Sequence, residues 1–383
     1  MFILHALRIS GAMGWEILWP LILGFSLSAA IQAVVSHRQM SNLLPDDSPK
    51  TLIKAGLLGA ASSSCSYAAV ALARSIFRKG GNFTAAMTFQ MASTNLVVEL
   101  GIIMLLLLGW QFTAAEFIGG PIMIAVLAFL FHRFLTKRLV NEASIQANKG
   151  LNGRMEGHAA MDDMAIQGKA NIFKKLASSE GITATSHFFV MDWASIWTDV
   201  VVGLLIAGAL TAWVPTAFWQ AFFFVHHPLF ATIWGPLVGP IIAIISFVCS
   251  IGNVPLAAVL WNSGISFGGV ISFIFADLLI IPILAIYKKY YGLRMSAFLL
   301  ATFYLAMVVA GYAIEGLFAL LNITPETRNA TVLSPHISLN YTAVLNVLFI
   351  AIAGVLVCRF MTTGGPMMLK MMRQPGNIHS HHH

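Results

Sequence analysis

The sequence predicts an all-α polytopic membrane protein. It has two inverted-topology repeats, each of three transmembrane helices plus a re-entrant hairpin, and one extra C-terminal helix. Three observations predict this fold class. The 383 residues are 58% hydrophobic and only 10% charged, which is more apolar than a water-soluble domain of this size requires. The chain repeats itself at a fixed offset, and its Lys and Arg residues are divided unevenly between the two sides of the predicted spans.

Apolar segments that approach or exceed the length needed to cross a bilayer recur along the chain. The first begins after MFILHALR and has a signal peptide as its alternative interpretation. We interpret it as a membrane helix, because its flank is only weakly basic and the repeat described below includes it. The segments lie at 14–36, 52–78, 82–109, 113–133, 194–214, 229–262, 267–287, 296–321 and 341–363.

The composition changes between 134 and 193, where the chain becomes polar and basic and contains Gly and Asn. We interpret this stretch as a cytoplasmic linker loop between two membrane halves. The predicted divisions are 1–133 (first membrane repeat, hairpin 52–78), 134–193 (linker), 194–321 (second membrane repeat, hairpin 229–262), 322–340 (external loop) and 341–383 (last transmembrane helix and cytoplasmic tail).

An internal repeat relates SSSCSYAAVALARSIFRKGGNF at 62–83 to SFVCSIGNVPLAAVLWNSGISF at 246–267. Without gaps, 62–95 and 246–279 share ten identities in 34 positions, whereas chance in apolar text gives about two or three. Shared low complexity is the alternative, but it rarely aligns Cys-Ser, Gly and Phe together. Many secondary transporters are built from two such equivalent halves.

The distribution of positive charge distinguishes two topologies. If 52–78 and 229–262 each cross the membrane, Lys and Arg divide 13 to 9 between the two sides. If each is a hairpin that enters and leaves on one side, the division becomes 20 to 2, with only Arg8 and Arg328 outside. The positive-inside rule favours the hairpins. Each repeat then has three spans, which is an odd number. The second repeat therefore starts on the opposite side of the membrane and is inverted relative to the first.

The two hairpin tips, 62–66 and 249–253, are therefore expected to approach each other near the membrane midplane. Non-helical backbone is tolerated at that depth only where it is buried in protein or lines a cavity. A helix that begins after each tip directs partial positive charge toward whatever lies between them.

Cys65 and Cys249 are the sharpest candidates for binding a substrate, because a thiolate binds soft metals and trivalent arsenic. The alternative for each is a small buried packing residue. Neither belongs to a CxxC pair, and the third cysteine, Cys358, is interpreted as packing. The predicted substrate-binding residues are Cys65, Ser64, Ser66, Cys249, Ser250, Asn253 and Asn95.

Glu99 and Asp277 are acids inside apolar segments and are the predicted proton-coupling residues. Glu99 lies four residues after Asn95, which places both on one face of a continuous helix. A carboxylate at this depth costs at least about 2.5 kcal/mol and usually marks an ion or proton path. The alternative is a protonated acid hydrogen-bonded to a neighbouring helix. Four further acids nearer segment ends are interpreted as interfacial: Glu16, Asp192, Asp199 and Glu315.

A metal site is not firmly predicted. His158 and Met161 are weak candidates within the linker, because the run from 155 to 164 mixes Met, His and acids without tight ligand spacing. The terminal His run at 379–383 is either a natural chelating tail or a tag remnant. We expect no cofactor.

The pattern around Cys65 with RSIFRKGGNFTAAMTFQMAS, and SIGNVPLAAVLWNSGISFGGVISFIFADLLIIP at 250–282, resembles the bacterial predicted-permease family typified by the ArsP-like organoarsenical exporters. The resemblance covers 10–363 apart from the linker. It implies an inner-membrane permease, with Cys65, Cys249, Asn253 and Pro255 on the family's motif positions. Many members carry a Pro-rich element after the first hairpin, where this chain has Ala-Ser-Thr-Asn-Leu at 92–96.

Three classes of function are compared. A proton-coupled exporter of a small thiophilic solute, such as a trivalent organoarsenical or soft metal species, is favoured by the opposed hairpins and central acids. A channel or facilitator with the same hairpins is the alternative. An enzyme is not expected, because no HExxH, G-x-S-x-G or redox Cys pair is present. The expected partners are a small-molecule or metalloid substrate and the lipid bilayer, not nucleic acid, and a homo-oligomer is possible. The expected localisation is the bacterial inner membrane, with the N-terminus outside.

Overall fold

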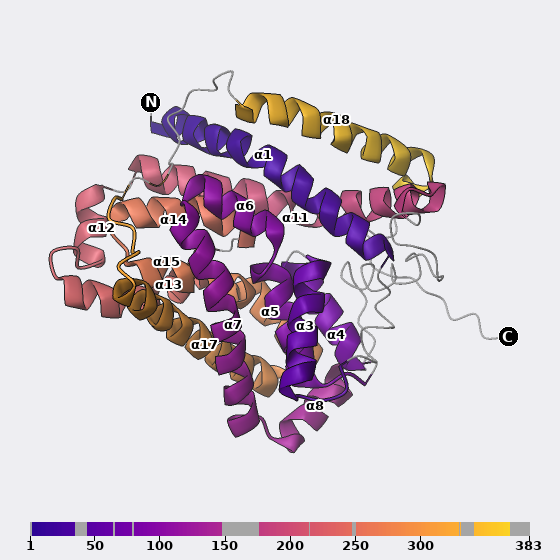
Figure 1. Ribbon diagram of the computed structural model, residues 1–383, viewed down its shortest axis with the longest axis horizontal. Coiled ribbons are helices and arrows are strands. Elements are labelled where there is room, and N and C mark those ends of the chain that lie inside the picture. Colours follow the sequence, from indigo (N-terminus) through magenta and orange to yellow (C-terminus); the bar gives the residue numbers. More distant parts are fainter. Residues whose placement is uncertain are drawn as a thin grey trace.

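The computed structural model describes residues 2–34, 44–63, 66–78, 80–147, 176–213, 215–246, 250–328, 330 and 341–367. Within these ranges all regular structure is helical (Figure 1). The helices are α1 (Phe2–Val34), α3 (Pro49–Ser62), α4 (Ser66–Arg78), α5 (Phe83–Asn95), α6 (Val98–Leu107), α7 (Trp110–Phe134), α8 (Lys137–Ala147), α11 (Ser179–Trp213), α12 (Thr216–Phe222), α13 (Pro228–Ser246), α14 (Ser250–Ser263), α15 (Phe267–Phe275), the 3₁₀ helix η2 (Ala276–Leu279), α16 (Ile281–Tyr291), α17 (Leu293–Leu320) and α18 (Tyr341–Thr362).

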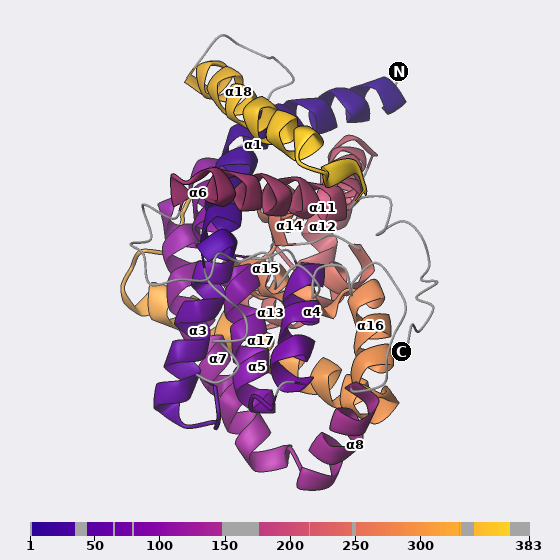
Figure 2. The same cartoon turned by 90° about the vertical axis from the view of Figure 1, so that its right-hand side faces the viewer.

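Three long helices, α1, α11 and α18, pack against one another and form a layer on one side of the molecule (Figures 1 and 2). The Ser10 hydroxyl of α1 donates a 2.9 Å hydrogen bond to the Leu204 carbonyl of α11. The Asn346 amide of α18 donates a 2.8 Å bond to the Trp15 carbonyl of α1. The other helices form a bundle beneath this layer.

Helix boundaries recur at the 184-residue offset of the sequence repeat. Helix α4 corresponds to α14, α5 to α15 with η2, α6 to α16, and α7 to α17. The N-caps recur as well: the side chains of Asn82 and Ser266, at equivalent positions, accept from the backbone N–H of Ala85 and Gly269. Helix α3 packs along α5 as α13 packs along α15. The two halves of the chain thus have the same order of elements and the same helix pairs.

Each half contains a broken helix. The predicted spans 82–109 and 267–287 correspond to the candidate span 83–107 and to the bent pair 267–291, but each is interrupted rather than continuous. Helix α5 ends at Asn95, Val97 is extended, and α6 begins at Val98. In the second half, η2 ends at Leu279 and α16 follows at an angle of 44°. Ile280 is extended there, and Pro282 in the first turn of α16 lacks the N–H that would continue the ladder.

Helices α3 and α4 form a pair in which the end of α4 lies beside the start of α3. Asn82, after α4, donates its backbone N–H to the carbonyl of Leu44, before α3, at 2.8 Å. Helix α3 ends because Ser63 adopts a left-handed conformation with φ of 36°. Arg74 of α4 donates to the Ala147 carbonyl at the end of α8, at 2.9 and 3.2 Å. The open end of this pair, where α3 begins and α4 ends, therefore lies beside α8.

Helices α13 and α14 form the second such pair. Gly264, after α14, lies so close to Val225, before α13, that a Cβ at Gly264 would be 2.3 Å from Val225 Cγ2. Arg328, which follows α17, donates to the carbonyls of Trp261 and Ile265 at 2.7 and 2.8 Å. The open end of this pair, where α13 begins and α14 ends, therefore lies beside the segment that follows α17.

The two pairs open toward opposite ends of α17. The first turn of α17 lies beside α8, where Arg294 contacts Glu142 at 3.3 Å. The last turn leads to the segment that carries Arg328. A helix of 28 residues is about 42 Å long, so its two ends are a membrane thickness apart.

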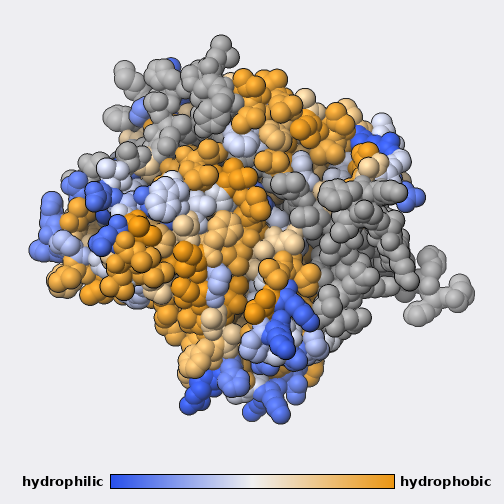
Figure 3. All heavy atoms as spheres, in the orientation of Figure 1, coloured by the Kyte–Doolittle hydropathy of each residue, from blue (hydrophilic) through white to orange (hydrophobic). Residues whose placement is uncertain are grey.

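Five spans among the described residues are long and apolar enough to cross a membrane, one of them α5 and α6 taken together (83–107), or six if the bent pair from 267 to 291 is one span. Figure 3 shows a broad apolar surface, with hydrophilic side chains at its lower end, where α7 leads into α8, and at its left edge. The predicted linker at 134–193 contains more helix than expected, because α8 lies inside it and α11 begins at Ser179 rather than near 194.

Candidate functional site

Asp277 is the centre of the candidate site. It lies in the single 3₁₀ turn of η2, at the break of the second half, and is fully buried. The Ser66 hydroxyl, in the first residue of α4, donates a 2.7 Å hydrogen bond to its Oδ2 atom. The second carboxylate oxygen, Oδ1, is buried without a hydrogen-bond partner of good geometry within the described chain.

Three further polar side chains surround the same carboxylate at longer range: Ser250, Asn95 and Thr94. Ser250 is the first residue of α14, so the helix after each predicted tip begins beside Asp277. The Asn95 amide donates to the Met91 carbonyl at 3.2 Å and to Thr94 Oγ1 at 3.1 Å. These hydroxyls and amides, together with two helix N-termini, stabilise negative charge at this point.

Asn253 lies one turn into α14 and is fully buried. Both polar atoms of its amide lack a hydrogen-bond partner among the described residues. A buried amide without partners is rare in folded proteins. Such an amide is free to form hydrogen bonds with a ligand. Five predicted residues lie outside the described residues, namely Ser64, Cys65, Cys249, His158 and Met161, so their side chains are not placed.

Glu99 does not share a helix with Asn95, which corrects the prediction that they lie on one continuous face. Helix α5 ends at Asn95, whereas Glu99 belongs to the first turn of α6 beyond the break. Glu99 is buried, with 6% of its surface exposed. The free amides at the start of α6 favour a carboxylate in this position.

Glu116 of α7 is a buried acid that sequence reasoning missed. It is fully buried, neither oxygen has a hydrogen-bond partner in the described residues, and it interacts electrostatically with Asp277. A signal existed: a lone acid inside the apolar segment 113–133. Gln90 was missed as well, and its amide donates to the Tyr287 hydroxyl, joining α5 to α16.

Glu315 was interpreted as interfacial, and it lies near the C-terminal end of α17. Its carboxylate accepts the backbone N–H of Gly268 in the first turn of α15, so it holds the start of α15, which follows the second helix pair. Arg328 interacts electrostatically with it. The side chains of Glu16, Asp192 and Asp199 lie outside the described residues.

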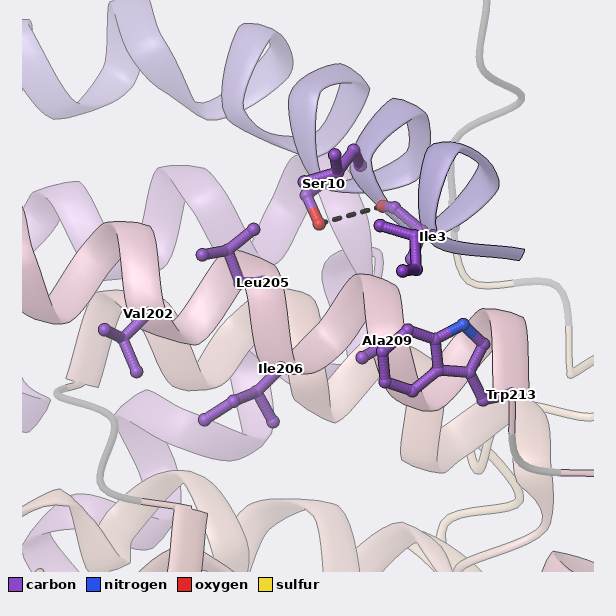
Figure 4. Close-up of a pocket in the computed structure, with 9 residues that line it drawn as sticks. Ile3, Ser10, Val202, Leu205, Ile206, Ala209 and Trp213 are labelled. Atoms are coloured by element: carbon purple, nitrogen blue, oxygen red, sulfur yellow. Dashed lines mark hydrogen bonds between the residues drawn. The ribbon is translucent and has the colours of Figure 1, made fainter. Parts of the chain in front are cut away.

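Two apolar pockets lie away from the Asp277 centre. One, of about 290 Å³, lies between α1 and α11; Figure 4 shows Leu205, Ile206 and Trp213 pointing into it. The other, of about 630 Å³, lies between α3 and α7 and reaches Leu96 at the first helix break. Neither is lined by an acid or a cysteine, so both are suited to lipid chains rather than to polar chemistry.

Apolar helices of membrane-spanning length around a buried polar centre define a multi-pass membrane protein of the transport class. The chain belongs to the ArsP_1 family, described as "Predicted permease", which it matches over residues 3–316. It is 63% identical over 349 residues to a protein of Mycobacterium tuberculosis named "Putative permease Rv2963", an alignment that covers 91% of this chain and 86% of that protein. No solved structure matches the chain.

Proposed function

We propose that this permease is a proton-coupled exporter of the inner membrane. Its substrate is a small thiophilic solute, such as a trivalent organoarsenical or a soft metal species, bound between the Cys-Ser tips. One observation carries the proposal: Ser66 and Ser250, each directly after a cysteine and 184 positions apart, lie around one carboxylate, that of Asp277. Because each cysteine is the covalent neighbour of one of these serines, we expect the two thiols to act together as a bidentate soft site.

The arrangement of the helix pairs supports inverted repeats with two re-entrant hairpins. The pair α3–α4 opens toward α8, and the pair α13–α14 opens toward Arg328 at the other end of α17. Equivalent halves that face opposite sides allow one half to rock against the other, so that a fixed central site opens to each side in turn.

The described basic residues support the proposed orientation. Most lie at the α8 end: Lys50, Arg74, Arg78, Arg133, Lys137, Arg138, Lys288, Lys289 and Arg294. Arg328 lies at the other end. By the positive-inside rule, the α8 end faces the cytoplasm. The linker and the C-terminus are then cytoplasmic, and the N-terminus is outside.

Burial of the centre favours a carrier over a channel. Asp277, Asn253 and Asn95 each have 0% of their surface exposed. A carrier passes through such a closed state, whereas a channel or facilitator keeps a continuous path. In the proposed cycle, the solute enters from the cytoplasm, is held between the tips, and leaves as Asp277 or Glu99 exchanges a proton with the outside.

A resistance assay tests the function. A toxicant-sensitive bacterium expresses the wild type, Cys65→Ser, Cys249→Ser or, as a matched control, Cys358→Ser in the last helix. The panel comprises trivalent methylarsenical, arsenite, copper, zinc, mercury and a drug that does not bind thiols. We expect resistance to one thiophilic compound that is lost in Cys65→Ser and in Cys249→Ser and retained in Cys358→Ser, at equal expression.

Other outcomes contradict distinct parts of the proposal. Resistance that survives both substitutions leaves a permease and overturns the two-thiol site. No protection against any compound overturns the thiophilic export. Solute flux that is insensitive to the pH gradient in the wild type, with Glu99→Gln and Asp277→Asn equally active, favours the facilitator.

A further inference from the structure

Glu116 faces both helix breaks at once. It precedes Gly119 and Gly120 by three and four residues, so all three lie on one face of α7. A Cβ at Gly119 would be 3.0 Å from the ring of Phe275, which directly precedes η2. A Cβ at Gly120 would be 2.4 Å from Leu96, which lies at the break of the first half. The two glycines thus bring the Glu116 face of α7 against the two places where backbone regularity is lost.

The Glu116 and Asp277 carboxylates interact electrostatically, and neither forms an ion pair in the described parts of the chain. Three carboxylate oxygens have no hydrogen-bond donor of good geometry among the described residues: both of Glu116 and Oδ1 of Asp277. The Oδ1 atom of Asn95, whose side chain also surrounds Asp277, lacks one too. The described residues thus place no well-aligned donor on any of these four oxygens.

Two neighbouring carboxylates inside a membrane do not both remain ionised, because like charges in a low dielectric repel strongly. One bound proton removes one charge and supplies an O–H donor to the acceptors that lack one. A second proton would neutralise the remaining carboxylate and so remove the negative charge that the two helix N-termini and the Ser66 hydroxyl stabilise. We propose that Glu116 and Asp277 form a carboxyl pair that binds a single exchangeable proton; this rests on the proposed function, for which the pair is the coupling site.

The other titratable groups around α7 do not neutralise the pair. Helix α6 contributes Glu99, beyond the first break, and α17 contributes Glu315, whose carboxylate is held by Gly268. Helix α16 contributes Tyr287, which accepts from Gln90. Helices α5 and α15 carry no titratable side chain. The lysines of α3, Lys50 and Lys54, are exposed.

Glu99 provides a matched control. It is a buried acid in the same set of helices, and the Glu99→Gln change removes the same chemical group as Glu116→Gln. The structure records no interaction between Glu99 and Asp277 in the residues it describes. The proposal therefore assigns different roles to Glu99 and Glu116, although both acids lie in similar apolar segments of the sequence.

The test uses the purified full-length protein in lipid nanodiscs and requires no solute. Infrared difference spectra between acidic and alkaline buffers detect the carbonyl stretch of protonated carboxyl groups. We expect a band in the wild type that is lost on alkalinisation. Glu116→Gln and Asp277→Asn should each move the midpoint of its loss by about one pH unit or more, the threshold for coupled groups. The double variant should lack the component of the band that belongs to the pair, whereas Glu99→Gln should remove only the component of Glu99 itself and leave the midpoint of the pair unchanged.

A wild-type midpoint retained in Glu116→Gln overturns the pair. A band that sodium abolishes at constant pH also overturns it, because the site then binds a metal cation. Glu116→Asp keeps a carboxyl group at the position and should keep a band with the coupled behaviour. It tests the proposal even if an amide variant fails to fold, which size-exclusion chromatography reveals.

Transport distinguishes this inference from the function on which it rests. With a solute identified by the resistance assay, Glu116→Gln should retain solute exchange between equal concentrations and lose accumulation driven by a pH gradient. A coupled carboxyl band in a protein that exports nothing on the panel contradicts the substrate and leaves the pair. Accumulation driven by a pH gradient in Glu116→Gln contradicts the pair and leaves the exporter.

Discussion

Ser66 donates a 2.7 Å hydrogen bond to Asp277, although 211 residues separate them in the sequence. The bond joins the start of α4 in the first half to the broken helix of the second half. It is buried on both sides, so water does not replace it when it is lost. The contact therefore couples the position of the first helix pair to the state of the central carboxylate.

Replacing Ser66 by Ala should destabilise the protein and impair transport. The substitution leaves Asp277 Oδ2 buried without its donor, which costs about 1–3 kcal/mol. Ser272→Ala is the matched control, because Ser272 is equally buried but donates only to Gly269 within its own turn, at 3.0 Å. Denaturation in detergent micelles measures the difference. An equal loss in the two variants would contradict a special role for the Ser66 bond.

Gly59 should tolerate no side chain, because α3 approaches α5 closely at that point. A Cβ at Gly59 would be 2.3 Å from the Phe89 carbonyl oxygen, and a backbone atom does not move aside easily. Gly59→Ala should lower the free energy of unfolding by about 1–3 kcal/mol. Gly56→Ala, one turn earlier with nothing within 4 Å, should be neutral or stabilising by about 0.5–1 kcal/mol. Thermal unfolding of the two variants compares them, and a loss for Gly56→Ala as large as for Gly59→Ala would contradict the interpretation.

Arg328 should stabilise the end of the second helix pair that lies away from α8. Its guanidinium donates to two carbonyls and lies 4.4 Å from the centroid of the Trp261 ring. Hydrogen bonds from charged groups contribute about 1.5–3 kcal/mol, so Arg328→Ala should speed amide exchange at the end of α14 by roughly tenfold or more. Exchange measured by mass spectrometry over 256–268 reports it. Arg138→Ala, which removes an exposed pair with Glu142, should leave that segment unchanged.

The start of α3 should loosen at acidic pH. Asp46 accepts from Thr51 Oγ1 at 2.6 Å and from Ser48 Oγ at 2.7 Å, and these bonds lower the pKa of Asp46 below its usual 3.8. A carboxyl whose pKa is lower in the folded state stabilises the fold above its unfolded pKa. That contribution disappears as the pH falls through the folded pKa.

Amide exchange over 48–52, taken relative to the intrinsic exchange rate at each pH in a series of acidic buffers, should therefore accelerate as the pH falls below 3.8. Asp46→Asn should remove this acceleration, since the amide does not titrate. The neighbouring Asp47→Asn serves as a control and should retain it. Acceleration in Asp46→Asn equal to that of the wild type would show that another group is responsible.

Much of the order of elements could be predicted from the repeat. The predicted equivalence of 62–95 with 246–279 agrees with the bounds of α4 and α14 and with the caps at Asn82 and Ser266. These features are local: a Ser or Asn with a free acceptor starts a helix wherever the chain places it. The roles predicted for Cys65 and Cys249 stay predictions, because neither residue lies in the described parts of the chain.

The helix breaks could not be predicted from hydropathy. Leu96 and Val97 are apolar and lie between two apolar helices. The hydropathy pattern therefore continues across the break and gives no indication of it. The break exists because the neighbouring elements hold it open, including the close contact of Gly120 with Leu96. For this reason the sequence placed Glu99 and Asn95 on one helix, whereas they lie on two.

By itself, the sequence determined that the chain is an apolar, helical, internally repeated membrane protein, because composition and periodicity report burial and secondary structure directly. It also identified Asp277 as an acid inside an apolar segment. Only the tertiary structure decided which groups meet Asp277: Ser66 and Ser250 from two helix starts, and Glu116 from a helix with no recognised motif. Such contacts depend on the packing of helices far apart in the chain, and a buried charge is stabilised by its neighbours in space rather than in sequence.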